Sequence, residues 1–228
     1  MPFALKTIAW DVDDVLNDLM QSWFELKWLK DHPECKIKYE ELAENPPHRI
    51  LGVDVHSYLE SLDEFRLSPL YLEMRPVEEV MEWFNKNGNS FRHVALTAVP
   101  LIAAPVSAHW VFKHFGPWIR TFHFIPSRRK GQCIQEYDSD KGAFLKWIEK
   151  ADVFLDDNPA NIQAAESSGV MGIIIPRPWN KATAQRAKSI GQRAESKGQR
   201  AEGKGQRAGG KGQRAKSITE ALKNLNGL

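Results

Sequence analysis

Two groups of carboxylates follow short apolar runs in this sequence. The run from Thr7 to Trp10 is uncharged, and it is followed by Asp11 and Asp13, which one valine separates. A second apolar run ends at the adjacent pair Asp156 and Asp157. We interpret both runs as buried strands whose carboxyl ends reach solvent. Carboxylates can bind Mg²⁺ and can act as nucleophiles or as general acids and bases. These four aspartates are therefore the first candidates for chemistry.

The D-x-D pattern taken alone is consistent with several kinds of site. A calcium loop of the EF-hand type needs an oxygen ligand and a glycine where the sequence has Val15 and Leu16, so we exclude it. A nucleotide-sugar transferase site stays open, but it leaves Asp156 and Asp157 without a role. A structural role, as solvated ends of strands, is usual for one such group. Two groups at the ends of separate strands favour a functional site.

Strand-like and helix-like segments alternate about five times after residue 6. The strand-like runs are residues 7–10, 92–97, 121–125, 152–155 and 172–175. The main helical segments between them are residues 76–87, 104–115, 141–150 and 158–168. This alternation predicts an α/β fold, in which a Rossmann-like parallel sheet carries helices on both faces. Ligands bind at the carboxyl ends of the strands in such sheets, where we expect the four aspartates and Thr97.

Four segments resemble the motifs of the haloacid dehalogenase-like (HAD) phosphohydrolases and occur in the order of that family. They are Ile8–Leu16, Leu96–Thr97 after a strand, Lys141 at the start of a helix, and Val153–Pro159. The resemblance covers about residues 5–180. It implies a HAD-like core formed by residues 1–16 and 73–180, with a small helical cap, residues 17–72, inserted after the first strand.

The resemblance also implies a phosphatase mechanism. Asp11 would attack phosphorus and form an aspartyl-phosphate, and Asp13 would protonate the leaving oxygen and then activate water. Thr97 would bind phosphate oxygens, and Lys141 would offset charge in the transition state, with Lys130 as the alternative lysine. The implied ligands of Mg²⁺ are Asp11, Asp13, Asp156 and Asp157. Which member of the last pair binds the metal directly stays open. The second acid, Asp13, favours phosphoryl transfer because the dehalogenases of the superfamily lack it.

The substrate is less clearly indicated than the reaction. Aromatic residues of the expected cap could stack a nucleobase, although aromatics at helical spacing usually pack in a core. They are Trp23, Trp28, Tyr39, Tyr58 and Phe65. The whole arrangement, including Pro176 to Asn180 after the last strand, is most similar to the 5'(3')-deoxyribonucleotidase branch. We therefore expect a hydrolase of small phosphorylated metabolites, with a (deoxy)nucleoside monophosphate as the candidate substrate.

The net charge of +2 over 228 residues averages two opposed regions. Ten Lys or Arg against two Glu give residues 185–218 a charge of +8, so the remainder carries −6. Five near-identical seven-residue units, AQRAKSI to GQRAKSI, form this basic region. We predict a frayed helix or a disordered segment within a tail, residues 181–228, that ends in a short helix. The tail supports an alternative function in binding nucleic acid or another polyanion, with the core as a scaffold or a polynucleotide-end phosphatase. No aromatic residue interleaves the charges, so base stacking is unsupported.

Several other classes of protein are disfavoured. Cys35 and Cys133 form no CxxC pair and suggest reduced thiols, so we expect a cytoplasmic protein. The N-terminus meets acids before any long apolar run, which is unlike a signal peptide. The longest apolar stretch, residues 94–106, is too short to span a bilayer, and we expect no membrane partner.

Overall fold

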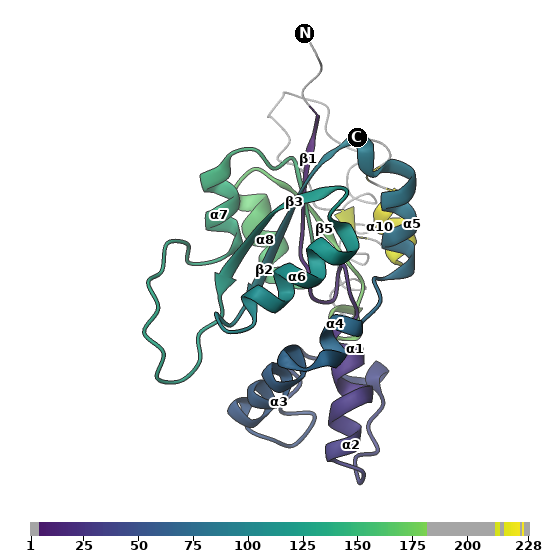
Figure 1. The fold of residues 1–228 in the computed structure, drawn as a ribbon, viewed down its shortest axis with the longest axis vertical. Coiled ribbons are helices and arrows are strands. Elements are labelled where there is room, and N and C mark those ends of the chain that lie inside the picture. Colours follow the sequence, from purple (N-terminus) through teal and green to yellow (C-terminus); the bar gives the residue numbers. More distant parts are fainter. Residues whose placement is uncertain (1–4, 182–212, 215–216, 224, 226–228) are drawn as a thin grey trace, which may run out of the picture.

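A single parallel sheet organises the molecule (Figure 1). The computed structural model describes residues 5–181, 213–214, 217–223 and 225. The strands lie in the order β3-β2-β1-β4-β5-β6, and every neighbouring pair is parallel. They are β1 (Thr7–Trp10), β2 (Arg92–Val99), β3 (Ile119–Pro126), β4 (Val153–Asp156), β5 (Met171–Ile174) and β6 (Gln213–Arg214). The predicted α/β fold is confirmed, and the two strands that lead to the aspartates are neighbours at its centre.

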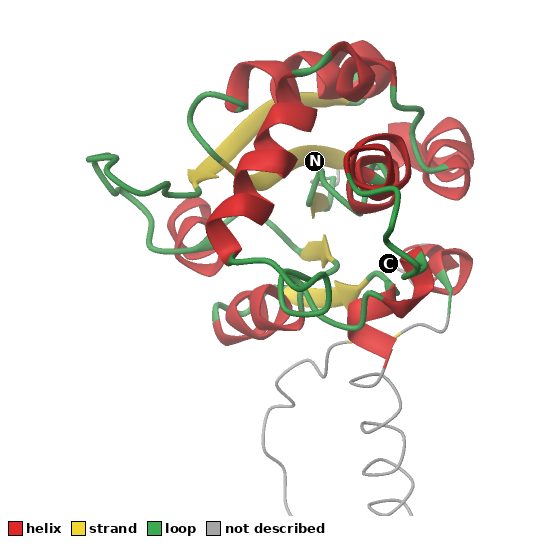
Figure 2. Ribbon diagram, turned by 90° about the horizontal axis from the view of Figure 1, so that it is seen from below, coloured by secondary structure: helices red, strands yellow, loops and turns green. Residues whose placement is uncertain are grey.

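Helices cover both faces of the sheet (Figure 2), and the side chains of β1 alternate between two cores. Ile8 and Trp10 belong to the larger core, which includes side chains of α5 (Glu78–Asn87), α6 (Ala104–Phe115) and α10 (Ile218–Lys223). Ala9 belongs to a smaller core on the other face, with α7 (Lys141–Ile148) and α8 (Pro159–Ser167). This period of two is the geometry of a central strand buried on both faces. No helix of the described part is long and apolar enough to cross a membrane.

A helical segment leaves the sheet directly after β1 and returns before α5. It contains α1 (Leu19–Trp23), the π-helix η1 (Phe24–Trp28), α2 (Leu29–Asp31), the 3-10 turn η2 (Tyr39–Glu41), α3 (Val55–Leu67) and α4 (Pro69–Glu73). Its two ends meet, because Asn17 and Pro76 form an antiparallel bridge. We call residues 17–76 the cap segment. In Figure 1 it lies beyond the carboxyl end of β1, so it is placed to cover that edge of the sheet.

The aromatic residues of the cap segment are packed in the larger core, which continues from the sheet into this segment. Trp23 is fully buried, and its ring centroid lies 5.4 Å from that of Trp28 and 5.3 Å from that of Tyr58. Phe65 is also fully buried, and Tyr39 is only 9% exposed. These contacts support the packing role of the aromatics over the base-stacking role that the sequence left open.

The end of the basic repeat differs from the expected frayed or disordered segment. Gln213–Arg214, in the last unit, pairs as β6 with the edge of β5. Ile218, at the start of α10, packs against the larger core, and Ala221, Leu222 and Leu225 are buried in it. These four residues have the spacing i, i+3, i+4 and i+7 of an amphipathic helix, which explains the docking. The other units lie in residues 182–212, outside the described residues.

His93 links β2 to Trp10 at the end of β1. Its buried imidazole should make the stability of the protein depend on pH. Trp10 Nε1 lies 3.0 Å from His93 Nδ1, and His93 Nε2 lies 2.8 Å from the carbonyl oxygen of Gly88. One ring nitrogen therefore accepts and the other donates, which is the neutral form. Burial lowers the pKa of His93 below its usual 6.5.

Because the unfolded chain binds this proton more readily, the stability contributed by neutral His93 should decrease as pH falls from about 6.5 toward the lower folded pKa. His93→Gln keeps a donor and an acceptor but does not titrate. Melting temperatures measured between about pH 7.5 and pH 5.5 should therefore fall more for the wild type than for the variant. The exposed control His56→Gln should follow the wild type, and parallel curves for wild type and His93→Gln would contradict the assignment.

Candidate active site

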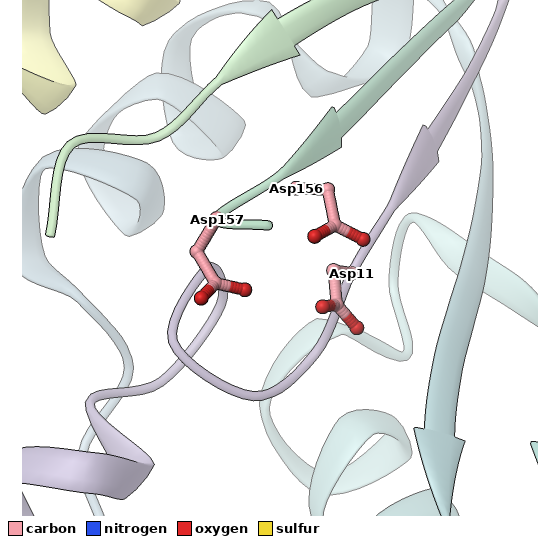
Figure 3. A group of neighbouring side chains, drawn as sticks. All are labelled: Asp11, Asp156 and Asp157. Carbon is pink, nitrogen blue, oxygen red and sulfur yellow. The ribbon is translucent and has the colours of Figure 1, made fainter. Parts of the chain in front are cut away.

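Three buried carboxylates meet where β1 and β4 end (Figure 3). Trp10 lies opposite Leu155 in the paired strands, and the Asp11 N–H donates to the Leu155 carbonyl at 2.9 Å. This register brings Asp11 beside the end of β4, where Asp156 and Asp157 lie. One carboxylate oxygen from each of the three aspartates lies within 4.8 Å of the others. The predicted gathering of Asp11, Asp156 and Asp157 is therefore present.

Lys141 is the cation of this group. Its Nζ lies 2.6 Å from Asp11 Oδ2 and 2.7 Å from Asp156 Oδ2, and the residue is 3% exposed. Two local features place it there. Asp140 caps α7 by accepting from the Ala143 N–H. Gly142 lets α7 approach α8, because a Cβ at this position would lie 2.8 Å from the Cβ of Ala164.

The charges of the group are unbalanced. Burial raises the pKa of Asp11, and burial together with Asp156 raises the pKa of Asp157 to about 8. Burial opposes the charged form of Lys141, but Asp11 and Asp156 outweigh it and raise the pKa of Lys141 above its usual value. Three carboxylates therefore face one ammonium. An all-oxygen donor set with excess negative charge suits a hard divalent cation such as Mg²⁺.

The hydrogen bonds distinguish the two adjacent aspartates. Both oxygens of Asp156 already accept, from Lys141 and from the Asn158 N–H and the Asn161 amide. Asp157 accepts on Oδ2 from Trp179 Nε1 at 2.7 Å, and among the described residues Oδ1 has no donor. Both oxygens of Asp11 also accept, from the Val12 N–H and from Lys141. In the described part of the chain, Asp157 Oδ1 is thus the oxygen of this group that has no donor and is open to a cation.

The loop after β1 is held in a tight conformation. Asp14 has a φ of 62°, in the left-handed region that few residues other than glycine adopt. Arg177 fixes this loop, because its Nε donates to the Asp14 carbonyl at 2.7 Å and its Nη1 lies 2.6 Å from Asp18 Oδ1. Burial raises the pKa of Asp14 to about 7, although Arg177 opposes this shift. The loop turns the chain from β1 into the cap segment.

A cavity of about 310 Å³ lies between this edge of the sheet and the cap segment. The sheet side contributes Asp11, Asp13, Thr97, Lys141, Asp157 and Asn158, and the loop after β3 adds Ser127 and Arg129. The cap side contributes Leu19, Met20, Tyr58, Leu59, Leu62 and Arg66. The cavity therefore has an acidic floor and a mainly apolar roof, with one arginine in that roof.

Comparison with known proteins identifies the fold. No model of a known protein family matches the sequence, and no curated protein matches it. A protein from Thermotoga maritima described as a putative β-phosphoglucomutase has a TM-score of 0.56 at 15% identity, over 98% of this chain and 100% of that one. A haloacid dehalogenase-like hydrolase from Streptococcus pneumoniae has a TM-score of 0.52 at 9% identity, over 75% and 85%. One from Bacteroides fragilis has a TM-score of 0.50 at 13% identity, over 75% and 88%.

This chain has the HAD-like fold. The resembling segments of the sequence lie in this fold around one cavity, although they are far apart in the chain. Five of the six predicted site residues line it, namely Asp11, Asp13, Thr97, Lys141 and Asp157. The sixth, Asp156, is fully buried beside them and contacts Lys141. The alternative Lys130 is exposed and is not among the cavity-lining residues.

Asp13 is the predicted residue whose position differs most from the expectation. It lines the cavity, but its carboxylate is not in the group formed by Asp11, Asp156 and Asp157. Its Oδ2 instead lies 3.1 Å from Arg66 Nη2, in the cap segment. The HAD-like fold thus brings three of the four expected metal ligands together, and it turns the fourth toward the cap segment.

The residues that hold these carboxylates could not be singled out from the sequence. Asn161 had a weak local signal, because it lies one helical turn after Asn158. Trp179 and Asn180 lie in the run after β5 that contributed to the resemblance, and they contact the Asp157 carboxylate and carbonyl, respectively. Arg66 had no signal, since it is one arginine among the charges of a helix in the cap segment.

Proposed function

We propose that this protein is a cytoplasmic, Mg²⁺-dependent phosphatase that hydrolyses small phosphomonoesters through an aspartyl-phosphate on Asp11. The observation that carries the proposal is the group of three buried carboxylates with one lysine, set in the floor of a cavity of about 310 Å³. The HAD-like fold adds weight to the proposal. The free thiols Cys35 and Cys133 fit a reducing compartment.

The residues would divide the work as follows. Asp11 attacks phosphorus while the bond to the ester oxygen breaks, and Asp13 gives its proton to that oxygen so that the alcohol leaves. Asp13 then takes a proton from water, whose oxygen attacks phosphorus and releases inorganic phosphate and free Asp11. Thr97 donates to a phosphate oxygen, and Lys141 offsets the charge that develops in both transition states.

Asp11 and Asp157 would hold the Mg²⁺ ion, while Asp156 holds Lys141. When bound, the ion would neutralise the repulsion between the Asp11 carboxylate and a phosphate dianion. The cation fits because the three carboxylates exceed the one ammonium, and because Asp157 Oδ1 is without a donor among the described residues.

For the substrate, we propose a small phosphorylated metabolite, and the resemblance makes a (deoxy)nucleoside monophosphate the first class to test. Of the five aromatics suggested for base stacking, only Tyr58 lines the cavity, and it is 2% exposed. A base would therefore contact aliphatic side chains such as Leu59 and Leu62. Sugar phosphates, which need no stacking surface, belong in the same panel.

Metal removal tests the proposal. Phosphate release should be measured from p-nitrophenyl phosphate, sugar phosphates and nucleoside monophosphates with Mg²⁺, with excess EDTA, and after Mg²⁺ is restored. We expect activity only with Mg²⁺, and we expect Mg²⁺ to raise the melting temperature because it binds only the folded state. Full activity in EDTA would exclude the metal, and no phosphate release from any ester would exclude the phosphatase.

A further inference from the structure

A chain of alternating charges joins Asp13 to the cap segment and back to the core. Arg66, on α3, contacts Asp13 Oδ2 through Nη2 at 3.1 Å and through Nε at 3.3 Å. Its Nη1 lies 3.2 Å from Asp63 Oδ1, one turn earlier on α3. Asp63 in turn accepts from Arg129 Nε and from Arg129 Nη2 at 2.8 Å. Arg129 belongs to the loop after β3, so α3 is held to the core at both ends of this chain.

The other oxygen of Asp13 is held by a second group. Asn17 Nδ2 donates to Asp13 Oδ1 at 3.2 Å, and the Tyr71 hydroxyl lies 3.0 Å from the same oxygen. Ionised Asp13, the form that takes a proton from water in the second step, can only accept, so Tyr71 donates to it. Ser107, on α6, supports the Tyr71 hydroxyl at 3.2 Å. Four donor groups therefore meet Asp13, all of them from the cap segment, and three of them belong to Arg66 and Tyr71.

The members of this network have different functions in it. Arg129 Nη1 donates to the carbonyl and hydroxyl oxygens of Ser127, while its Nε and Nη2 bind Asp63. Arg129 therefore serves as a fixed anchor for α3. Arg66 uses its donors on two carboxylates, one of which is Asp13, and like Arg129 it lines the cavity. Its side chain is 9% exposed, so water contributes little to this ion pair.

Stability alone is a weak explanation for these buried charges. Replacing a buried ion pair by apolar residues of similar volume is often neutral or stabilising, so such pairs usually need another reason. Here the charges converge on one side chain that borders the cavity, and the contacts fix both oxygens of that side chain. A residue that acts as general acid and base must lie within hydrogen-bond reach of the proton that it transfers. Contacts that fix both oxygens of its carboxylate can therefore control its orientation.

We propose that Arg66 and Tyr71 are positioning residues through which the cap segment orients Asp13 for proton transfer. This inference rests on the proposed function, in which Asp13 is the acid and the base. It makes the cap segment part of the catalytic arrangement and not only a cover for the cavity. Asp63 contributes without touching Asp13, because it holds Arg66 against the anchor Arg129.

The dependence of the rate on the leaving group separates positioning from a general loss of structure. An alkyl phosphate needs a proton on the departing oxygen, whereas p-nitrophenyl phosphate has an acidic leaving group that departs without one. General acid catalysis typically contributes about 10²-fold to 10⁴-fold. Arg66→Lys and Tyr71→Phe should therefore lower the rate for the best alkyl substrate at least about tenfold more than the rate for p-nitrophenyl phosphate.

The experiment compares kcat/KM for the two esters in the wild type, Arg66→Lys, Tyr71→Phe, Asp63→Asn and the exposed control Arg92→Gln. The ratio of the two rates is measured on one protein sample, so it does not depend on the fraction that folds. Asp13→Asn, which lacks the acid and base altogether, should show the largest change in the ratio and serves as the reference. We expect all three network variants to shift the ratio toward that limit and Arg92→Gln to leave it unchanged.

Two results would count against these ideas in different ways. An active wild type whose network variants lose both activities equally would overturn the positioning role and leave the proposed function intact. A wild type that releases phosphate from neither ester would overturn the proposed function and this inference together. The pair Arg66→Lys and Asp13→Asn adds a second check. If Arg66 acts through Asp13, the double variant should be no slower on the alkyl ester than Asp13→Asn alone.

Discussion

Asp11→Asn should reduce phosphate release by at least about 10⁴-fold, as expected when a catalytic nucleophile is removed. An amide oxygen is a poor nucleophile and cannot form the acyl phosphate, so the first step fails. The fold should survive, because asparagine has nearly the same shape and Lys141 keeps its contact with Asp156 at 2.7 Å. The substitution also removes one of the three buried carboxylates, so the repulsion between negative charges at the end of β4 decreases.

The measurement combines steady-state phosphate release with acid-quench trapping of the phosphorylated protein. Wild type supplied with a radiolabelled substrate should carry acid-stable label at Asp11, and Asp11→Asn should carry none. Asp31→Asn is the matched control, since Asp31 is an exposed aspartate that pairs with Lys27. Wild-type turnover by Asp11→Asn, or label at another residue, would show that the aspartyl-phosphate mechanism is wrong.

The sequence predicted the site best where a candidate catalytic residue lies at the end of a recognisable strand. Asp11 follows β1 and Asp156 ends β4, so the end of each apolar run predicted the edge at which they meet. Lys141 was harder to choose, because Lys130 also follows a strand. The capping Asp140 and the following Gly142 were visible in the sequence, but their effect depends on how closely α7 and α8 pack.

The contacts of Asp13 could not be predicted in this way. Arg66 and Tyr71 lie 53 and 58 residues from Asp13 in the chain. In the sequence, Arg66 cannot be distinguished from a solvated charge on a helix. Its contact with Asp13 depends on the position of α3 beside the cavity. The same holds for α10, whose apolar spacing is visible in the sequence, because its contact with α5 joins segments far apart in the chain.

Lys141→Met should affect stability and activity together. It removes the ammonium that lies 2.6 Å from Asp11 and 2.7 Å from Asp156, and it leaves three carboxylates buried with no cation among them. Removing one partner of a buried ion pair typically costs about 3–5 kcal/mol of unfolding free energy. Loss of one group that stabilises transition-state charge typically lowers kcat by about 10²-fold to 10³-fold. Lys146→Met, on the exposed face of the same helix, is the matched control and should change neither quantity measurably.

A second substitution separates the two effects of Lys141. In Lys141→Met/Asp156→Asn one of the two carboxylates that paired with the lysine is also removed, so part of the lost stability should return in urea unfolding without Mg²⁺. The Asn158 N–H, which donates to Asp156 Oδ1 at 2.7 Å, can still donate to the side-chain carbonyl of the substituted residue. Activity should stay low, because the ammonium that offsets charge in both transition states is still missing. Recovery of activity together with stability would mean that Lys141 only balances Asp156, and that the charge acting on the phosphate comes from elsewhere in the cavity.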